Sequence, residues 1–83
     1  MKITVRYFAS IREAIGRSSE QCETSAVTLA ALRDELLAAS PAHAGSLARG
    51  KSVRMALNQV MSDESAVLSE GCEVAFFPPV TGG

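Results

Sequence analysis

Apolar and polar residues alternate along several short stretches of the chain, and this pattern predicts a β-sheet. In the first stretch Ile3, Val5 and Tyr7 point to one side, and a period of two positions is typical of a strand with one face against a core. Strands are expected at residues 2–8, 19–24, 53–58, 60–61 and 73–77. The alternation is weakest in the second of these, and Asn58-Gln59 supplies a tight turn between the third and the short fourth.

Leucines at helical spacing predict one main helix. Leu29, Leu32 and Leu36 recur every three or four positions after Thr28, whose hydroxyl can accept a hydrogen bond from a free amide of the first turn. The helix is therefore expected from Thr28 to about Ala39, with its charged residues Arg33, Asp34 and Glu35 facing water. Pro41 lies just beyond the helix and is expected to stop it.

Two further segments complete the predicted elements. Ser10 and Glu13 have the spacing of a capping box, which predicts a short helix that starts at Ser10 and ends at Gly16 in a left-handed cap. The ten residues after Pro41 are expected to form an irregular connection, with one helical turn near Leu47 and with His43 exposed in the loop.

This order of elements predicts an α+β fold in which a small mixed sheet packs on one main helix. If that helix is a crossover, the strands on either side of it that become neighbours are parallel, and the other pairs are antiparallel. With 83 residues the chain is long enough for one domain, and we expect residues 1–83 to form one, with residues 78–83 as an extended flexible tail.

Composition and charge exclude several classes of function. With 47% hydrophobic and 20% charged residues the chain is expected to fold, and 8 Lys+Arg against 9 Asp+Glu leave no basic footprint for nucleic acid. The sequence has neither a signal peptide nor an apolar run long enough to span a membrane, so we expect a cytoplasmic protein without a membrane partner. Cys22 and Cys72 are expected to be free thiols, and no metal site or bound cofactor is expected because zinc-ligand spacing is absent.

The unusual feature is the C-terminal sequence Phe77-Pro78-Pro79-Val80-Thr81-Gly82-Gly83. Two prolines have no amide hydrogens and end the sheet, and the six residues from Pro78 can reach about 20 Å. Gly82 and Gly83 carry no side chains, so a terminal carboxylate could pass through a narrow channel for acylation chemistry.

A frayed terminus is the competing interpretation of the last two glycines. The apolar stem argues against it, because Phe77, Pro78, Pro79 and Val80 form a continuous apolar surface that suggests a partner. Phe76 is expected in the core. The expected partner-binding residues are Phe8, Phe77, Pro78, Pro79, Val80 and Thr81. Phe8 is included because it becomes a neighbour of Phe77 if the first and last strands are adjacent.

The chain resembles the small-subunit family of molybdopterin synthase, the MoaD type of the ubiquitin-like β-grasp sulfur carriers. The stretch 70–83, EGCEVAFFPPVTGG, carries most of the resemblance, and the stretches 5–13 and 56–59 are similar too. Cys72 is a departure, since the family usually has an acidic residue there. The stem from Phe76 to Thr81 separates this family from other Gly-Gly carriers.

The resemblance implies a β-grasp fold and a chemical cycle at Gly83. A ubiquitin-activating-like adenylyltransferase of the MoeB type would use ATP to adenylate the Gly83 carboxylate, and sulfur would then replace AMP to give a thiocarboxylate. The large subunit of the synthase, of the MoaE type, would receive the tail and convert cyclic pyranopterin monophosphate to molybdopterin. The chain would be the sulfur-donating subunit of this enzyme and would not be catalytic alone.

Two alternatives remain open from the sequence. One is a sulfur carrier for thiamine or tRNA thiolation, because Gly82-Gly83 is shared with those carriers. The other is a ubiquitin-like modifier that is joined to lysines through Gly83.

Overall fold

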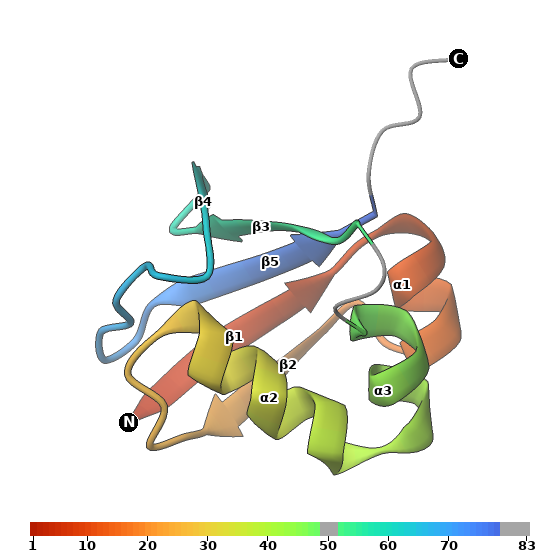
Figure 1. Ribbon diagram of the computed structural model, residues 1–83, viewed down its shortest axis with the longest axis horizontal. Coiled ribbons are helices and arrows are strands. Elements are labelled where there is room, and N and C mark those ends of the chain that lie inside the picture. Colours follow the sequence, from red (N-terminus) through yellow and green to blue (C-terminus); the bar gives the residue numbers. More distant parts are fainter. Residues whose placement is uncertain (49–51, 79–83) are drawn as a thin grey trace.

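The computed structural model describes residues 1–48 and 52–78, in which helices cover one face of a sheet (Figure 1). The elements in chain order are β1 (Lys2–Tyr7), α1 (Ala9–Ile15), β2 (Ser19–Glu23), α2 (Leu29–Ala39), α3 (Pro41–Leu47), β3 (Arg54–Leu57), β4 (Val60–Ser62) and β5 (Glu73–Phe77). Every predicted strand is present, and no strand end differs from its predicted position by more than one residue.

The sheet has five strands in the order β2-β1-β5-β3-β4. The central strands β1 and β5 are parallel, and Tyr7 lies beside Phe76 in their register. All other pairs are antiparallel. The predicted mixed sheet is therefore confirmed, including the parallel pairing of β1 and β5, which lie on either side of the main helix in the sequence and become neighbours in the sheet. A mixed sheet that curves around one main helix is the ubiquitin-like β-grasp architecture.

The turn between β3 and β4 lies at Asn58-Gln59, as predicted. Both residues have positive φ, 51° and 68°. A two-residue hairpin turn of type I′ requires this conformation at both central positions, and asparagine tolerates it better than most residues.

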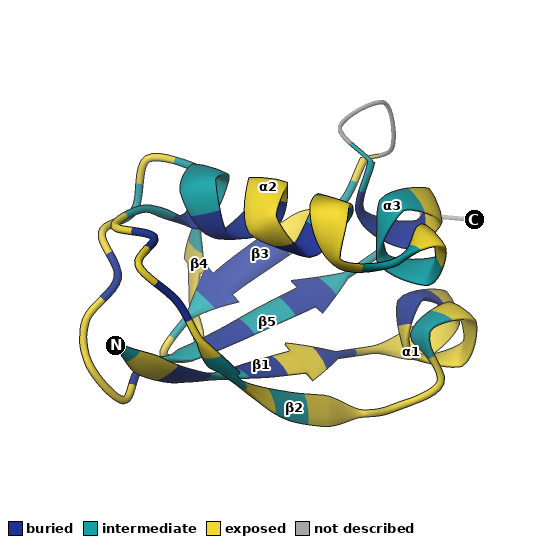
Figure 2. Cartoon of the chain, turned by 90° about the horizontal axis from the view of Figure 1, so that it is seen from below, coloured by how far each residue is buried: buried dark blue, intermediate teal, exposed yellow. Residues whose placement is uncertain are grey.

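The core lies between the sheet and α2, whose inner side is buried along its length (Figure 2). Thr28 caps α2 through a hydrogen bond from the Ala31 amide, 3.2 Å from the Thr28 hydroxyl oxygen, as predicted. Leu29, Leu32 and Leu36 are buried. They pack in one cluster with the inward residues of the central strands, which are Ile3, Val5, Tyr7, Val74 and Phe76.

The prediction that Arg33 faces water is wrong, because this residue is only 4% exposed. Its Nε donates a hydrogen bond to the carbonyl of Leu47 at 2.6 Å, and its Nη2 donates to the carbonyl of Ala48 at 2.9 Å. These carbonyls lie at the C-terminal end of α3, where no later turn of the helix can satisfy them. Arg33 thus caps α3 from α2.

The prediction of an irregular connection after Pro41 is wrong for residues 42–47, which belong to α3, and the helical turn predicted near Leu47 is part of that helix. Pro41 is the first residue of α3, where its missing amide hydrogen costs nothing, and Ser40 caps that helix by accepting from the His43 amide at 3.2 Å. One proline therefore both follows α2 and begins α3.

The first turn after β1 differs from the predicted capping box. The residue before α1 is Phe8, which makes no side-chain cap, and Ser10 lies inside the helix. The carbonyl of Phe8 accepts from the amides of Ile11 and Arg12 at 3.1 and 3.3 Å. Ala9 turns the chain here with a φ of 52°, and Gly16 ends the helix with a φ of 89°, as predicted.

Candidate functional site

The candidate site lies where the last strand ends. Phe77 is the final residue of β5, and the half-buried Pro78 follows it. The predicted site residues Pro79, Val80, Thr81, Gly82 and Gly83 lie outside the described residues. The described part of the site is therefore the surface around Phe77 and Pro78.

Phe8 and Phe77 lie side by side, as predicted from the adjacency of the first and last strands. Their ring centroids are 6.1 Å apart and the ring planes meet at 83°, an edge-to-face contact. The Phe8 amide donates to the Phe76 carbonyl at 3.2 Å, so β1 and β5 stay joined one residue beyond Tyr7. Phe8 is 37% exposed and Phe77 is half-buried. Their predicted role in binding a partner stays a prediction.

Arg6 also contacts the Phe8 ring. Its guanidinium carbon lies 5.3 Å from the centroid of the Phe8 ring, and its Nη1 lies 3.5 Å from Oε2 of Glu73. A guanidinium over an aromatic face is attracted by the ring electrons. An exposed ion pair of this kind adds little stability, so its main effect is to fix the position of Arg6.

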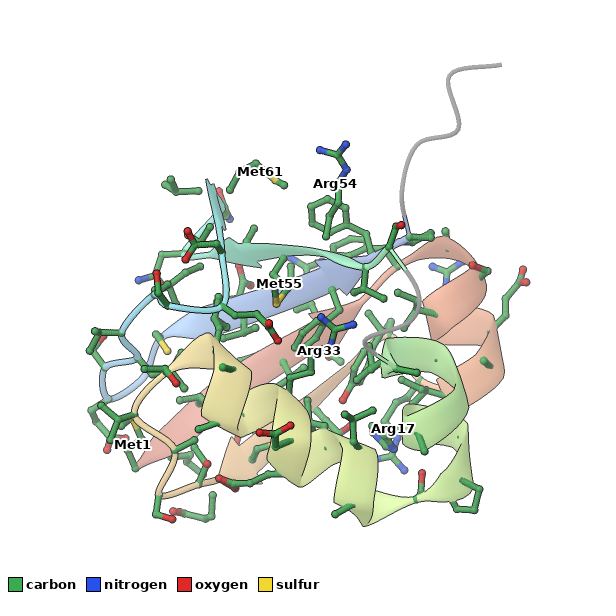
Figure 3. All side chains as sticks on the ribbon, in the orientation of Figure 1. Met1, Arg17, Arg33, Arg54, Met55 and Met61 are labelled. Atoms are coloured by element: carbon green, nitrogen blue, oxygen red, sulfur yellow. The ribbon has the colours of Figure 1, made fainter. Side chains whose placement is uncertain are left out.

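The apolar surface continues across the face of the sheet that carries no helix. The register places Ala56 of β3 opposite both Ala75 of β5 and Met61 of β4. Met61 is 54% exposed, and Figure 3 shows it with Arg54 on one side of the sheet, whereas Met55 and Arg33 lie between the sheet and α2. Ala56 is only 6% exposed, so the accessible part of this surface comes from Phe8, Met61, Ala75 and Phe77. We call these four residues together with Ala56 the open-face patch.

The contributions of Ala56, Ala75 and Met61 were not predicted from the sequence. The alternation of 53–58 does place Ala56 on the side opposite Met55, but that side was expected to be polar because Arg54 and Asn58 share it. The signal that could have found the patch is the register of the sheet, which depends on how distant segments pair.

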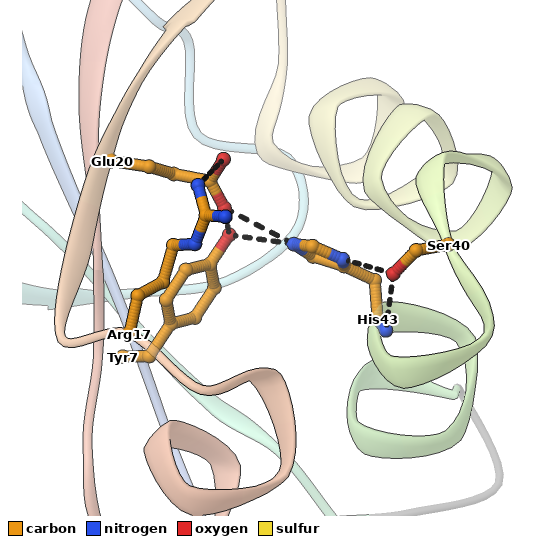
Figure 4. Close-up of polar contacts among 5 residues, drawn as sticks. All are labelled: Tyr7, Arg17, Glu20, Ser40 and His43. Atoms are coloured by element: carbon orange, nitrogen blue, oxygen red, sulfur yellow. Dashed lines mark hydrogen bonds and ion pairs between the residues drawn. The ribbon is translucent and has the colours of Figure 1, made fainter.

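A second group of polar side chains lies inside the helix-covered face, where β1, β2 and α3 meet (Figure 4). The Tyr7 hydroxyl donates to Oε2 of Glu20 at 2.5 Å, and Nε2 of His43 lies 3.2 Å from the Tyr7 hydroxyl and 3.1 Å from the same Glu20 oxygen. Nδ1 of His43 lies 2.7 Å from the Ser40 hydroxyl. The prediction that His43 is exposed in a loop is therefore wrong.

The directions of the pKa shifts in this group support a structural role. Burial first, and then the bond to the Glu20 carboxylate, raise the pKa of Tyr7 far above its ordinary value, so the hydroxyl stays a donor. Burial alone would raise the pKa of Glu20, but the hydrogen bonds with Tyr7 and His43 outweigh it and lower that pKa. Arg17 lies 3.6 Å from the other Glu20 oxygen. The network ties α3 to the strands β1 and β2.

An open hollow of about 270 Å³ lies beside this network, between β2 and α2, and Glu20, Cys22, Glu35 and His43 are among its lining residues. Within residues 1–48 and 52–78 no group of three or more His, Cys, Asp or Glu side chains could hold a metal ion. Among the same residues no helix is long and apolar enough to cross a membrane.

Both cysteines are free, as predicted. Cys72 is buried in the core. Burial, and then the nearby carboxylates of Glu20 and Glu35, raise the pKa of Cys22, which disfavours its thiolate. Neither thiol has the setting of a nucleophile.

Comparison with known proteins places these features in context. The ThiS family matches residues 5–83 of the chain. The chain is 41% identical over 81 residues to the molybdopterin synthase sulfur carrier subunit of Escherichia coli (strain K12), a match that covers 98% of this chain and 99% of that protein. It is 38% identical over 81 residues to the protein of the same name from Haemophilus influenzae, with the same coverage of 98% and 99%.

Solved structures show the same fold. A chain in the complex of subunits 1 and 2 of molybdopterin-converting factor from Helicobacter pylori 26695 is similar with a TM-score of 0.72 and 26% identity over 100% of both chains. SAMP1 from Haloferax volcanii is similar with a TM-score of 0.79 and 24% identity, also over 100% of both chains, and at this identity the likeness concerns the fold alone.

Proposed function

The chain belongs to the ThiS family, and from this membership and its similarity to molybdopterin synthase sulfur carrier subunits we propose that it carries sulfur for the synthesis of molybdopterin. The observation that carries the proposal is the extent of the family match, which runs to residue 83 and so includes the terminal Gly82-Gly83. The curated relatives match over nearly their whole length, which argues for the same role in a protein of the same size.

The chemistry proposed for Gly83 has two steps. A ubiquitin-activating-like adenylyltransferase joins the Gly83 carboxylate to AMP, with release of pyrophosphate from ATP. A sulfur donor then displaces AMP, so that the carbon–oxygen bond to the phosphate breaks and a thiocarboxylate forms. ATP is bound and consumed by the partner enzyme, and we assign no cofactor to the chain itself.

The thiocarboxylate then delivers sulfur inside the large subunit of the synthase. Its sulfur attacks cyclic pyranopterin monophosphate, and water cleaves the bond to the Gly83 carbonyl, which returns the chain to its carboxylate form. Two such transfers complete the dithiolene of molybdopterin. The contribution of the chain is proximity, because a reagent on a docked carrier reacts as if within one molecule. The acid and base groups come from the partner.

The open-face patch is the surface that we propose for docking the large subunit. It includes Phe77, the last residue of β5, so a partner that covers the patch lies next to the start of the predicted tail at Pro78. Apolar surface left exposed on a small domain commonly marks a protein interface. The similar structure from Helicobacter pylori, solved as a complex of subunits 1 and 2, supports a two-subunit assembly.

Reconstitution with the purified large subunit and cyclic pyranopterin monophosphate tests the proposal. After activation we expect the intact mass of the chain to rise by about 16 Da, because sulfur replaces one oxygen at Gly83. The loaded chain should yield molybdopterin. Deletion of Gly83 should abolish loading and leave the unfolding midpoint unchanged, because the last strand of the sheet ends six positions earlier in the sequence, at Phe77.

The outcome also separates the alternatives. Loading without molybdopterin formation would point to a carrier for thiamine or tRNA thiolation. Adducts on lysines in place of a thiocarboxylate would point to a protein modifier, and either result would overturn the proposal.

A further inference from the structure

The two arginines beside the aromatic pair are held very differently. The guanidinium of Arg6 already has intramolecular partners, an ion pair with the Glu73 carboxylate and a cation–π contact with the Phe8 ring. Arg54 is exposed, and among the described residues the structure gives its side chain no ion pair, hydrogen bond or ring contact. Its guanidinium projects from the open face of the sheet (Figure 3).

Arg54 cannot stay uninvolved when a partner covers the patch. It is paired with Phe77 in the register of β3 and β5, so the two side chains leave the same face of the sheet from directly opposite positions. Such positions have Cβ atoms about 4.5–5.5 Å apart. A protein surface that packs on the Phe77 ring therefore also reaches Arg54 and removes water from it.

A desolvated guanidinium needs a compensating group. An arginine cannot be neutralised by losing its proton in a protein, so its cost of burial must be offset by hydrogen bonds to an acceptor. A carboxylate is the acceptor that fits best, because its two oxygens can accept two parallel hydrogen bonds from the planar guanidinium. Glu73, the carboxylate on this part of the chain, already lies against Arg6.

We propose that an aspartate or glutamate on the large subunit of the synthase pairs with Arg54 when that subunit covers the open-face patch. This inference rests on the proposed function and adds the chemistry of the partner surface, which has an apolar centre over Phe8 and Phe77 and a carboxylate beside it. The pair selects among apolar surfaces, because a partner that lacks the carboxylate leaves a charge buried and unpaired.

One competing arrangement makes the opposite prediction. The apolar stem of Arg54 could lie along Phe77 while its guanidinium extends past the edge of the partner into water. In that case a methionine at this position would add apolar surface without loss, and the partner would bind it equally well or more tightly.

The test compares Arg54→Met with Lys2→Met in binding to the purified large subunit by titration calorimetry. Both substitutions remove one positive charge from the open face and change the formal net charge from -1 to -2. Lys2 is exposed and starts β1, so it lies four strand positions, or roughly 13 Å, before Arg6 and more than a Debye length of about 8–10 Å from Arg54. Thermal unfolding of both variants checks that folding is unaffected.

We expect Arg54→Met to raise Kd about tenfold or more, because a partner carboxylate is left without its pair. The Kd of Lys2→Met should stay within about twofold of the Kd of the unchanged chain, since salt screens its charge at that distance. Raising NaCl from about 0.05 to about 0.5 M should weaken binding to the large subunit more for the unchanged chain and for Lys2→Met than for Arg54→Met.

Equal or tighter binding by Arg54→Met, with normal binding by the unchanged chain, would overturn this inference and leave the proposed function intact. If the unchanged chain does not bind the large subunit at all, the proposed function fails and this inference fails with it.

Discussion

The two faces of the sheet use neighbouring residues of the same strands for different purposes. In β5, Val74 and Phe76 point into the core and are fully buried, whereas Ala75 and Phe77 point to the open face and stay half-buried. At the end of β1, Tyr7 is buried and the next residue, Phe8, is exposed. Apolar residues therefore lie on both faces, but only one face is covered by helices.

This difference separates folding from recognition. The covered face removes its apolar area from water when the chain folds, so it supplies stability at about 25 cal/mol per Å². The open-face patch stays partly in contact with water and contributes less. A domain of this size has a thin core, so aromatic residues left on the open face are better explained by a partner than by folding.

The covered face should be the more sensitive to loss of a ring. Phe76→Ala is expected to lower the free energy of unfolding by about 3–5 kcal/mol, because Phe76 is 0% exposed and its removal leaves a cavity. Urea unfolding followed by circular dichroism measures this loss. A loss below about 1 kcal/mol would mean that the core collapses around the missing ring and that the contrast between the faces is smaller than inferred.

Disrupting the polar network on the covered face is expected to cause the next largest loss of stability. Tyr7→Phe removes the hydroxyl that donates to Glu20, and a hydrogen bond to a charged group contributes about 1.5–3 kcal/mol. The hydrogen bonds of Glu20 lower its pKa in the folded state, so their stabilisation is present above the ordinary pKa of a glutamate and is lost as pH falls through the lowered value.

The free energies of unfolding of the unchanged chain and of Tyr7→Phe should therefore differ most at neutral pH and converge in acid. Glu13→Gln, which removes an exposed carboxylate of α1 outside the network, serves as the control. A gap between the unchanged chain and Tyr7→Phe that stays constant from neutral to acid pH would show that the hydroxyl acts by packing alone.

On the open face, loss of a ring should affect binding more than folding. Phe77→Ala is expected to weaken binding to the large subunit by about 1–3 kcal/mol, the range for a central aromatic anchor of an interface. Its effect on the free energy of unfolding should be below that of Phe76→Ala. If binding and stability fall by equal amounts, Phe77 serves folding as a core residue does and is not a specific binding residue.

The strands could be predicted because their pattern is local. Alternation at Ile3, Val5 and Tyr7 depends only on neighbours in the sequence, and so does the turn at Asn58-Gln59. The Gly-Gly terminus was found in the same way, from its own sequence.

The errors concern polar residues whose partners are distant in the sequence. Arg33 is buried because it meets the end of α3, and His43 is half-buried because it meets Tyr7 and Glu20 from two other elements. Arginine and histidine side chains are mostly exposed or partly exposed in proteins, so residue type alone predicts that they face water. The helix after Pro41 was missed because proline is as suitable at the start of a helix as after its end.

The smallest effect is expected at Ala9, in the turn between Tyr7 and α1. Its φ of 52° is left-handed, a conformation that costs a residue with a side chain about 1–2 kcal/mol. Ala9→Gly removes this strain but gives the unfolded chain more freedom, which offsets about 0.4–1 kcal/mol of the gain. We therefore expect a net stabilisation between about 0 and about 1.6 kcal/mol, measured by urea unfolding.

Ala14→Gly in the same helix is the matched control, since Ala14 is also exposed but does not have a positive φ. There glycine should destabilise by about 0.5–1 kcal/mol, so the two substitutions should have opposite signs. The strained turn is the one that directs the chain away from the sheet immediately after Phe8. If both variants lose equal stability, the backbone at Ala9 is not strained, and the turn that follows Phe8 stores no more energy than the rest of α1.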